Sequence, residues 1–202
     1  MQFLSANKLT HNDLWSLEDY DEKRQQFRSE VMSHKRDRQL ALNDHMRLYF
    51  EDRMTIQYQV QEMMRIERLF KKAEIQDELD AYNPLIPDGT NLKATFMIEY
   101  GNPEERKTAL RDLRGVEKYL YLTTGDQQRV KAIADEDLER EDEEKTSAVH
   151  FVRFELTPDM IAAIKNGADI GFIVDHPAAQ VMMNAVPDNV RQSLANDLWD
   201  AA

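Results

Sequence analysis

One carboxylate in the N-terminal part of the sequence is predicted to point toward a protein core. A helix is expected over about residues 55–72, and at about 100° per residue Glu67 falls in the middle of its apolar stripe. The stripe consists of four residues at helical spacing: Ile56, Val60, Met63 and Phe70. Because burying an unpaired carboxylate is strongly unfavourable, we expect Glu67 to be paired, metal-bound or protonated.

Arg24 has the matching position on the preceding helix, which is expected over about residues 16–36. Its neighbours on the apolar side of that helix are Tyr20, Phe27 and Val31. The pattern favours a structural ion pair between Arg24 and Glu67 that joins two packed helices. The alternative is an inward Glu67 that lines a ligand or metal pocket. Glu62 and Arg65 are expected on more exposed faces of the helix that carries Glu67.

His150 is predicted to point into an apolar layer, on a strand over residues 145–156. Side chains alternate along a strand, so His150 shares its face with Ala148, Val152, Phe154 and Leu156. A core histidine bonded to a backbone carbonyl is the commoner arrangement, and a metal ligand or general base is the alternative. The alternative needs a carboxylate, which Glu99 on the predicted strand 92–101 supplies if the two strands pair. Iron, manganese or zinc would be the expected metal, held by Glu67 and His150.

A long loop is expected over residues 81–91, where two prolines and an Asp-Gly pair stop regular structure. Long irregular loops in compact domains are often functional. Tyr82, Asn83, Asp88 and Lys93 therefore form a candidate binding loop. The alternative is a rigid crossing between the helical part of the chain and the sheet.

The remaining titratable groups carry weaker signals. Glu30 and His34 have the i,i+4 spacing that can seat a metal, but they lie at the polar edge of their helix. His176 lies at the end of a predicted strand, where catalytic groups are often found, but an exposed histidine in a turn is the commoner arrangement. The absence of cysteine excludes disulfides, thiolate nucleophiles and cysteine-ligated clusters. Motifs of zinc proteases, serine hydrolases, P-loop proteins and dinucleotide-binding proteins are also absent.

Charge is concentrated in two segments of this acidic chain, whose net charge is −12. Residues 135–144 hold eight acidic residues and one arginine; we expect a solvated loop, with a site for a divalent cation or a basic partner as the alternative. A basic cluster consists of Lys23, Arg24, Arg28, Lys35, Arg36 and Arg38. It is expected to be a solvated helix face, with docking of an acidic partner or a nucleic acid as the alternative. The overall acidity disfavours nucleic acid as the partner.

The elements that position these residues change type along the 202 residues. Further strands are expected at residues 46–50, 92–101, 145–156 and 169–177 and in a hairpin over 118–135, and further helices at 102–115, 157–167 and from 187 onward. Because helices and strands do not alternate regularly, we expect an α+β fold with N-terminal helices on a mostly antiparallel sheet and two or three further helices. The chain is expected to form a single domain over residues 1–202, helical to about 81 and sheet-rich from 82. Without a secretory signal or a membrane-length apolar run, it is expected to be cytoplasmic, with no membrane partner.

Three long stretches resemble a bacterial family catalogued as a domain of unknown function (number 3501). They are residues 35–70, 75–100 and 133–157, and the resemblance extends from about Leu9 to Leu198. Proteins of this family are often encoded beside a rubrerythrin-like protein and an iron–sulfur, heterodisulfide-reductase-like oxidoreductase. The resemblance therefore implies a part in peroxide defence or electron transfer, and it carries over no catalytic residues.

Two functions of different class follow from these observations. The first is a non-enzymatic accessory protein that binds redox partners, which fits the missing catalytic motifs and the segregated charge. The alternative is a small metal-dependent or ligand-binding enzyme that uses Glu67, His150 and Glu99.

Overall fold

The chain forms two compact units that interleave along the sequence. The structure is a computed structural model, and it describes residues 8–125, 128–134 and 145–199. One unit, called here the helical unit, consists of the described residues up to Asp37 together with Glu51–Asp88. The other, the sheet unit, consists of Arg38–Phe50 and the described residues from Gly89 onward. The α+β class expected from the sequence is confirmed, and the hairpin between the first two long helices belongs to the sheet unit.

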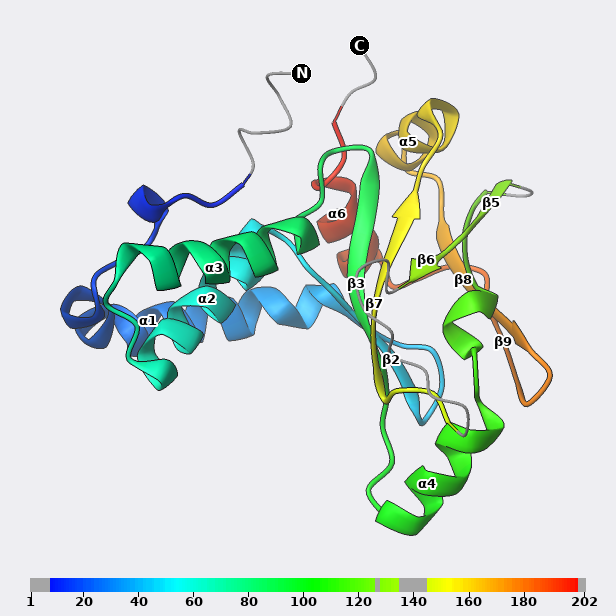
Figure 1. The fold of residues 1–202 in the computed structure, drawn as a ribbon. Coiled ribbons are helices and arrows are strands. Elements are labelled where there is room, and N and C mark those ends of the chain that lie inside the picture. The colour runs from blue at the N-terminus through cyan, green and yellow to red at the C-terminus, as the bar shows by residue number, and fades with distance from the viewer. Residues whose placement is uncertain (1–7, 126–127, 135–144, 200–202) are drawn as a thin grey trace. The chain divides into compact units, whose positions relative to one another are not determined.

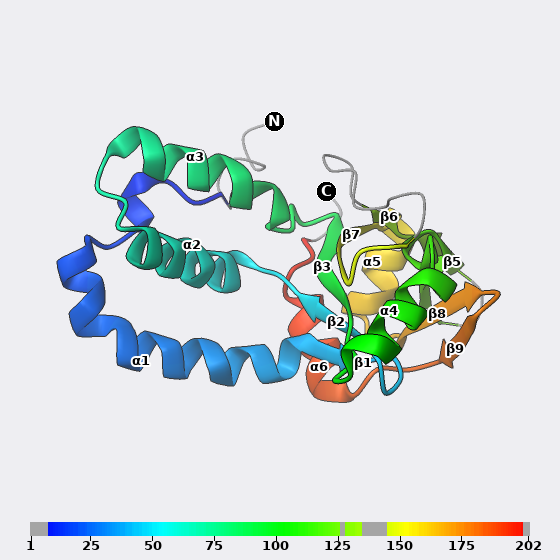
Figure 2. The same cartoon turned by 60° about the horizontal axis from the view of Figure 1, so that its bottom comes forward.

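Three α-helices make up most of the helical unit. Its elements are the 3-10 helix η1 (His11–Asp13), α1 (Leu17–Lys35), α2 (Arg53–Glu67), α3 (Lys72–Tyr82) and the 3-10 helix η3 (Asn83–Leu85), while η2 (Arg36–Arg38) follows α1. Helix α2 runs between α1 and α3 (Figure 2). In the described part of the chain, no helix is long and apolar enough to cross a membrane.

Helix α2 is buried on two opposite faces, which a single apolar stripe does not predict. Ile56, Val60 and Met64 pack with Leu79 of α3 in one apolar cluster. Tyr58, about 200° around the helix from Ile56, packs in a second cluster. Its partners there are Tyr20, Phe27 and Val31 of α1. A central helix therefore directs polar side chains inward on a face that an amphipathic pattern assigns to solvent.

The helix predicted over residues 55–72 ends earlier than expected. Arg68 adopts the left-handed conformation, with φ of 56°, and its N–H bonds the carbonyl of Met64. Phe70 consequently lies beyond the helix with 73% of its surface exposed, and it does not belong to the apolar stripe. Helix α3 begins four residues after Arg68, at Lys72.

The sheet unit contains two antiparallel sheets, where the sequence led us to expect one. Its elements are β1 (Gln39–Ala41), β2 (Met46–Phe50), β3 (Asn91–Ile98), α4 (Pro103–Asp112), η4 (Val116–Tyr119), β4 (Leu120–Thr124), β5 (Gln128–Lys131), β6 (Ile133–Ala134), β7 (Val149–Glu155), α5 (Pro158–Lys165), β8 (Ile170–His176), β9 (Ala179–Met183) and α6 (Asp188–Ala195) (Figure 1). The strand orders are β1-β2-β3-β7-β6 and β5-β4-β8-β9. The segment 128–134 passes from one sheet to the other, because β5 pairs with β4 and β6 pairs with β7.

One apolar core joins the two sheets. The ring of Phe172 on β8 lies 5.7 Å from that of Phe50 and 5.5 Å from that of Phe154, both on the other sheet. The helices predicted from residues 102 and 157 both begin with a side-chain cap: Asn102 accepts a hydrogen bond from the Glu104 N–H at 2.9 Å, and Thr157 caps α5. Because these caps fix where α4 and α5 start, they set which faces of the helices reach the core.

Candidate functional site

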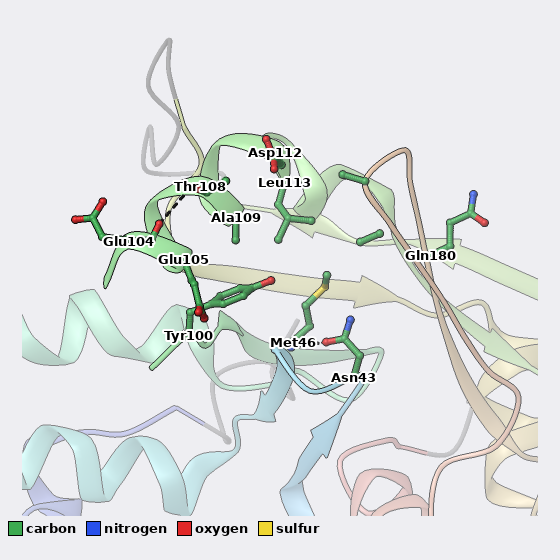
Figure 3. Close-up of a pocket in the computed structure, with 12 residues that line it drawn as sticks. Asn43, Met46, Tyr100, Glu104, Glu105, Thr108, Ala109, Asp112, Leu113 and Gln180 are labelled. Atoms are coloured by element: carbon green, nitrogen blue, oxygen red, sulfur yellow. Dashed lines mark hydrogen bonds between the residues drawn. The ribbon is translucent and has the colours of Figure 1, made fainter. Parts of the chain in front are cut away.

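An open groove of about 660 Å³ lies within the sheet unit (Figure 3). Helix α4 supplies one wall, and the β1–β2 connection and the turn into β9 contribute from the other sides. Its lining residues are Asn43, Met46, Tyr100, Glu104, Glu105, Thr108, Ala109, Asp112, Leu113, Ala178, Ala179 and Gln180. We call this feature the α4 groove.

The floor of the α4 groove is apolar and rigid. Met46 and Leu113 are 3% and 5% exposed and belong to the main core, which holds them in place. Tyr100 is half-buried beside them, and its ring is stacked on His45 with centroids 3.9 Å apart. Figure 3 shows Tyr100, Met46 and Leu113 around the same hollow.

The rim of the α4 groove is acidic. Glu104, Glu105 and Asp112 line it from α4, and all three are exposed. Residues 104, 108 and 112 are spaced by four, so they lie along one stripe of the helix. The first turn is held by the Asn102 cap, where carboxylates are also favoured by the helix dipole. Within the described residues, none of the three carboxylates has an ion-pair partner. Figure 3 shows the Glu105 side chain directed to Tyr100, whereas Glu104 points outward from the rim.

This arrangement suits the binding of a cationic side chain. A lysine or arginine can lay its methylene groups on an apolar floor while its charged end meets carboxylates at the rim. The lining residues include no histidine, lysine or arginine, and the polar groups other than the carboxylates are the Asn43 and Gln180 amides and the Tyr100 and Thr108 hydroxyls. These groups can bind and orient a cation through hydrogen bonds.

The predicted ion pair between Arg24 and Glu67 is wrong. Arg24 instead donates two hydrogen bonds to Glu62, from Nε to Oε1 at 2.7 Å and from Nη2 to Oε2 at 3.0 Å. Glu67 is exposed at the end of α2. Two further donors reach Glu62, the Tyr20 hydroxyl at 2.7 Å and Arg65 Nη2 at 3.0 Å. Arg24 meets Glu62 because Glu62 and Arg65 lie on the face of α2 that packs against α1.

Hydrogen bonding governs the titration of this cluster. The hydrogen bonds from Arg24, opposed by burial, lower the pKa of Glu62 to about 2. The same contact raises the pKa of Arg24, and burial followed by the bond to Glu62 raises the pKa of the Tyr20 hydroxyl. The cluster therefore stays charged at neutral pH and acts as a structural bond between α1 and α2.

His150 lies on the buried face that the alternation predicts, and it is 1% exposed. The pairing of strands β3 and β7 is confirmed, with Phe96 opposite His150. The neighbouring carboxylate is Glu117, not Glu99. His150 Nε2 lies 2.9 Å from Thr146 Oγ1, whose hydroxyl donates to Glu117 Oε2 at 3.4 Å.

Glu99 takes part in a separate, partly exposed contact. It accepts a hydrogen bond from the Tyr49 hydroxyl at 2.8 Å and lies 3.5 Å from Arg47. It directly follows β3, and alternation directs it to the face opposite Phe96 and hence opposite His150. Glu67 belongs to the helical unit, whereas His150 and Glu99 belong to the sheet unit. None of the three lines the α4 groove, and in the described part of the chain no three acidic or histidine side chains gather as a metal site.

The four residues of the candidate binding loop lie in different structural elements. Tyr82 is the last residue of α3, and Asn83 is buried, where its side chain bonds both the N–H and the carbonyl of Leu9 at 2.7 and 2.9 Å. Lys93 lies within β3, opposite Arg153. Asp88 and Lys93 fall in different units. The contacts of Asn83 with Leu9 are structural and lie within the helical unit.

The basic cluster is largely engaged in structural contacts. Arg28 donates to the Tyr58 hydroxyl at 2.9 Å, and Arg38 is buried and paired with Asp197. His34 pairs with Asp52, and Glu30 accepts from Gln26, so these two do not form the metal pair that their spacing allows. The expected solvated face is wrong for Arg38, which is buried, whereas Lys23, Arg28 and Arg36 are exposed. The acidic segment 135–144 lies outside the described residues.

His176 was expected to be exposed, and it is buried at 6%. Its Nε2 donates to the carbonyl of Arg114 at 3.1 Å, and its ring meets the ring of Tyr119 edge-on. The turn after it is short, since His176 pairs directly with Ala179 across β8 and β9. This tight hairpin brings Ala178 and Ala179 to the α4 groove.

Comparison with known sequences places this chain in a family. A family described as "Protein of unknown function (DUF3501)" matches residues 8–198. The chain belongs to this family. The resemblance seen in the sequence is thus confirmed over nearly its whole length.

A solved structure is similar to this chain throughout. A protein from Burkholderia pseudomallei, described as a novel protein of unknown function, shares 48% sequence identity with this chain. The match covers 95% of this chain and 99% of that protein, with a TM-score of 0.90. No curated protein matches this sequence.

Sequence reasoning identified α4 and both of its ends but not the groove beside it. A signal was present, because Glu104, Thr108 and Asp112 recur every four residues. The cations of the same helix, Arg106, Lys107 and Arg111, do not line the groove. The segregation of charge could have been found, whereas the apolar floor comes from residues distant in sequence.

Proposed function

We propose that this family member is a non-enzymatic accessory protein that binds a cationic surface of a redox partner through the α4 groove. The observation that carries the proposal is an unneutralised acidic rim, formed by Glu104, Glu105 and Asp112, above an apolar floor. The family resemblance supplies the partner class: an iron–sulfur oxidoreductase or a rubrerythrin-like protein in redox or peroxide-stress metabolism. The cytoplasm, expected from the sequence, is the compartment in which such partners would be met.

The physical basis of docking is electrostatic attraction completed by apolar contact. Exposed carboxylates attract a basic surface over about 10 Å at moderate ionic strength, and salt screens this attraction. The groove then takes up one lysine or arginine side chain, whose methylene groups cover Met46, Ala109 and Leu113. Such an interface binds reversibly, which suits an accessory protein that meets more than one partner.

Capture of the two partner proteins tests the proposal. The full-length protein, immobilised, is incubated with a purified iron–sulfur oxidoreductase and a purified rubrerythrin-like protein encoded beside it, at low and at high salt. We expect salt-sensitive capture of at least one of them. The double variant Glu105→Gln, Asp112→Asn should lower the affinity by about tenfold, since each exposed pair contributes up to about 1 kcal/mol.

A matched control separates the groove from general charge. Asp21 and Glu22 are exposed on α1, so Asp21→Asn with Glu22→Gln removes the same net charge elsewhere. This control should change the affinity less than about twofold. The proposal fails if neither partner is captured at low salt, or if the two double variants weaken capture equally.

A further inference from the structure

Strand β9 is an outer strand of its sheet that lacks the usual protection. It pairs with β8, and no second neighbour pairs with it among the described residues. Natural sheets guard such edges with charged side chains, proline or very short strands. Residues 179–183 are Ala-Gln-Val-Met-Met, with no charge and no proline, and Met182 is 73% exposed.

The other outer strands of the two sheets are better protected. Strand β5 carries Arg129 and Lys131, β6 has two residues, and β1 has three. Strand β9 is therefore the longest uncharged edge in the part of the chain that the structure describes. Its unpaired backbone groups form a template onto which another strand can add.

The open edge of β9 continues into the α4 groove. Ala179 and Gln180 belong to both, and Ala178 in the preceding turn also lines the groove. A segment added along β9 would thus lie beside the α4 groove, whose lining includes Glu105 and Asp112. Charge complementarity then selects the occupant, because a lysine or arginine at the groove end of the segment meets the unneutralised rim.

We propose that β9 accepts an extended segment of the partner that alternates apolar and basic residues, and that its cation enters the α4 groove. The inference rests on the proposed function and names the part of the partner that is recognised. Main-chain hydrogen bonds supply affinity in such strand addition, and side-chain pockets supply specificity. A second copy of this chain fits less well, since its β9 has no cation to offer and its net charge of −12 is repulsive.

The register of the β8–β9 hairpin identifies the backbone groups of β9 that can form hydrogen bonds with an added strand. A two-residue turn, Pro177–Ala178, separates the paired residues His176 and Ala179. Residues flanking such a turn form a hydrogen-bonded pair, and the pairs alternate along an antiparallel ladder. Gln180 and Met182 therefore direct their N–H and C=O groups away from β8, toward the added strand.

Nuclear magnetic resonance with two synthetic peptides tests the proposal on the full-length protein. One peptide has seven residues alternating lysine and valine, and its matched counterpart alternates glutamate and valine. We expect the basic peptide to shift the amide signals of Gln180 and Met182 and to slow their hydrogen exchange. The acidic peptide should leave these signals unchanged.

Two further measurements identify the backbone contact. Met182→Pro removes one outward N–H and should weaken binding by at least about tenfold, while Met182→Ala should change it less than about threefold. Methylating alternate nitrogens of the peptide gives a test that leaves the protein intact. One methylation register should abolish binding, and the other should preserve it.

Several outcomes would overturn the inference. These are no binding of the basic peptide, signal shifts confined to α4, equal binding of both peptides or of both methylated forms, or a dimer in solution with β9 protected. The partner capture described above is independent of these results. If a partner is captured through the α4 groove while Met182→Pro has no effect on capture, strand addition is wrong and the proposed function stands.

Discussion

Arg24 on α1 donates two parallel hydrogen bonds, of 2.7 and 3.0 Å, to the carboxylate of Glu62 on α2. Glu62 is the more deeply buried partner, with 13% of its side chain exposed against 34% for Arg24. Tyr20 and Arg65 satisfy its remaining lone pairs. A bidentate pair with this support fixes both the distance and the rotation of one helix against the other.

Removing the carboxylate of Glu62 should destabilise the helical unit. Glu62→Ala leaves Arg24 and the Tyr20 hydroxyl without their acceptor, and we expect a loss of about 2–4 kcal/mol in the free energy of unfolding. Glu67→Ala is the matched control, since this carboxylate is exposed on the same helix, and it should cost less than about 0.5 kcal/mol. Urea unfolding followed by circular dichroism measures both. Equal costs for the two variants would contradict the assignment.

The same carboxylate should make stability depend on pH. Its pKa is about 2 in the folded chain, below the value of about 4.3 for an unperturbed glutamate. Glu62 therefore contributes stability that is fully present above about pH 5 and is lost as the pH falls toward 2, amounting to roughly 3 kcal/mol.

Comparison with Glu62→Gln isolates this contribution. The difference in unfolding free energy between the native protein and Glu62→Gln should be largest at pH 7 and should shrink steadily from pH 5 to pH 2. Urea midpoints measured at several pH values test this. A difference that stays constant over the range would show that Glu62 does not titrate with a lowered pKa.

The buried chain of Glu117, Thr146 and His150 should depend on one hydroxyl group. Because the carbonyl of Ser147 only accepts, His150 Nε2 carries a proton, and Thr146 relays the contact to Glu117. Thr146→Val keeps the shape but removes the hydroxyl, and we expect it to cost about 1–3 kcal/mol. Thr146→Ser keeps the hydroxyl and should cost less than the valine variant. If serine is as costly as valine, the methyl group and not the hydroxyl matters.

Gly89 should tolerate no side chain. Its φ is 94°, and a Cβ added there would lie 2.1 Å from the Trp199 ring. The backbone N–H of Trp199 also donates a hydrogen bond to the Gly89 carbonyl at 3.0 Å. Gly89→Ala should therefore cost more than about 2 kcal/mol and shift the tryptophan fluorescence. Gly101→Ala is the control, because nothing lies within 4 Å of its Cβ, and it should change stability by less than about 0.5 kcal/mol. An unshifted spectrum in Gly89→Ala would contradict this packing.

Local signals in the sequence were sufficient to predict most elements. Asn102 and Thr157 start α4 and α5 as caps, and Gly167 lies in the left-handed conformation just after α5. Alternation along β7 correctly placed His150 on a buried face. These features depend on backbone hydrogen bonds and torsions among near neighbours, which the residue types themselves favour.

The partners of the buried polar groups depended on packing between distant segments. Arg24 meets Glu62 because α2 is buried on two faces and ends at Arg68, and neither fact follows from one apolar stripe. The residues next to Glu117 in the sequence do not predict its contact with the Thr146 hydroxyl. In the same way, residues 179–183 become a strand by pairing with β8, and the α4 groove exists because Met46 and Leu113 come together in one core. Such contacts depend on which apolar surfaces are buried against one another, and this is determined only when the whole chain has folded.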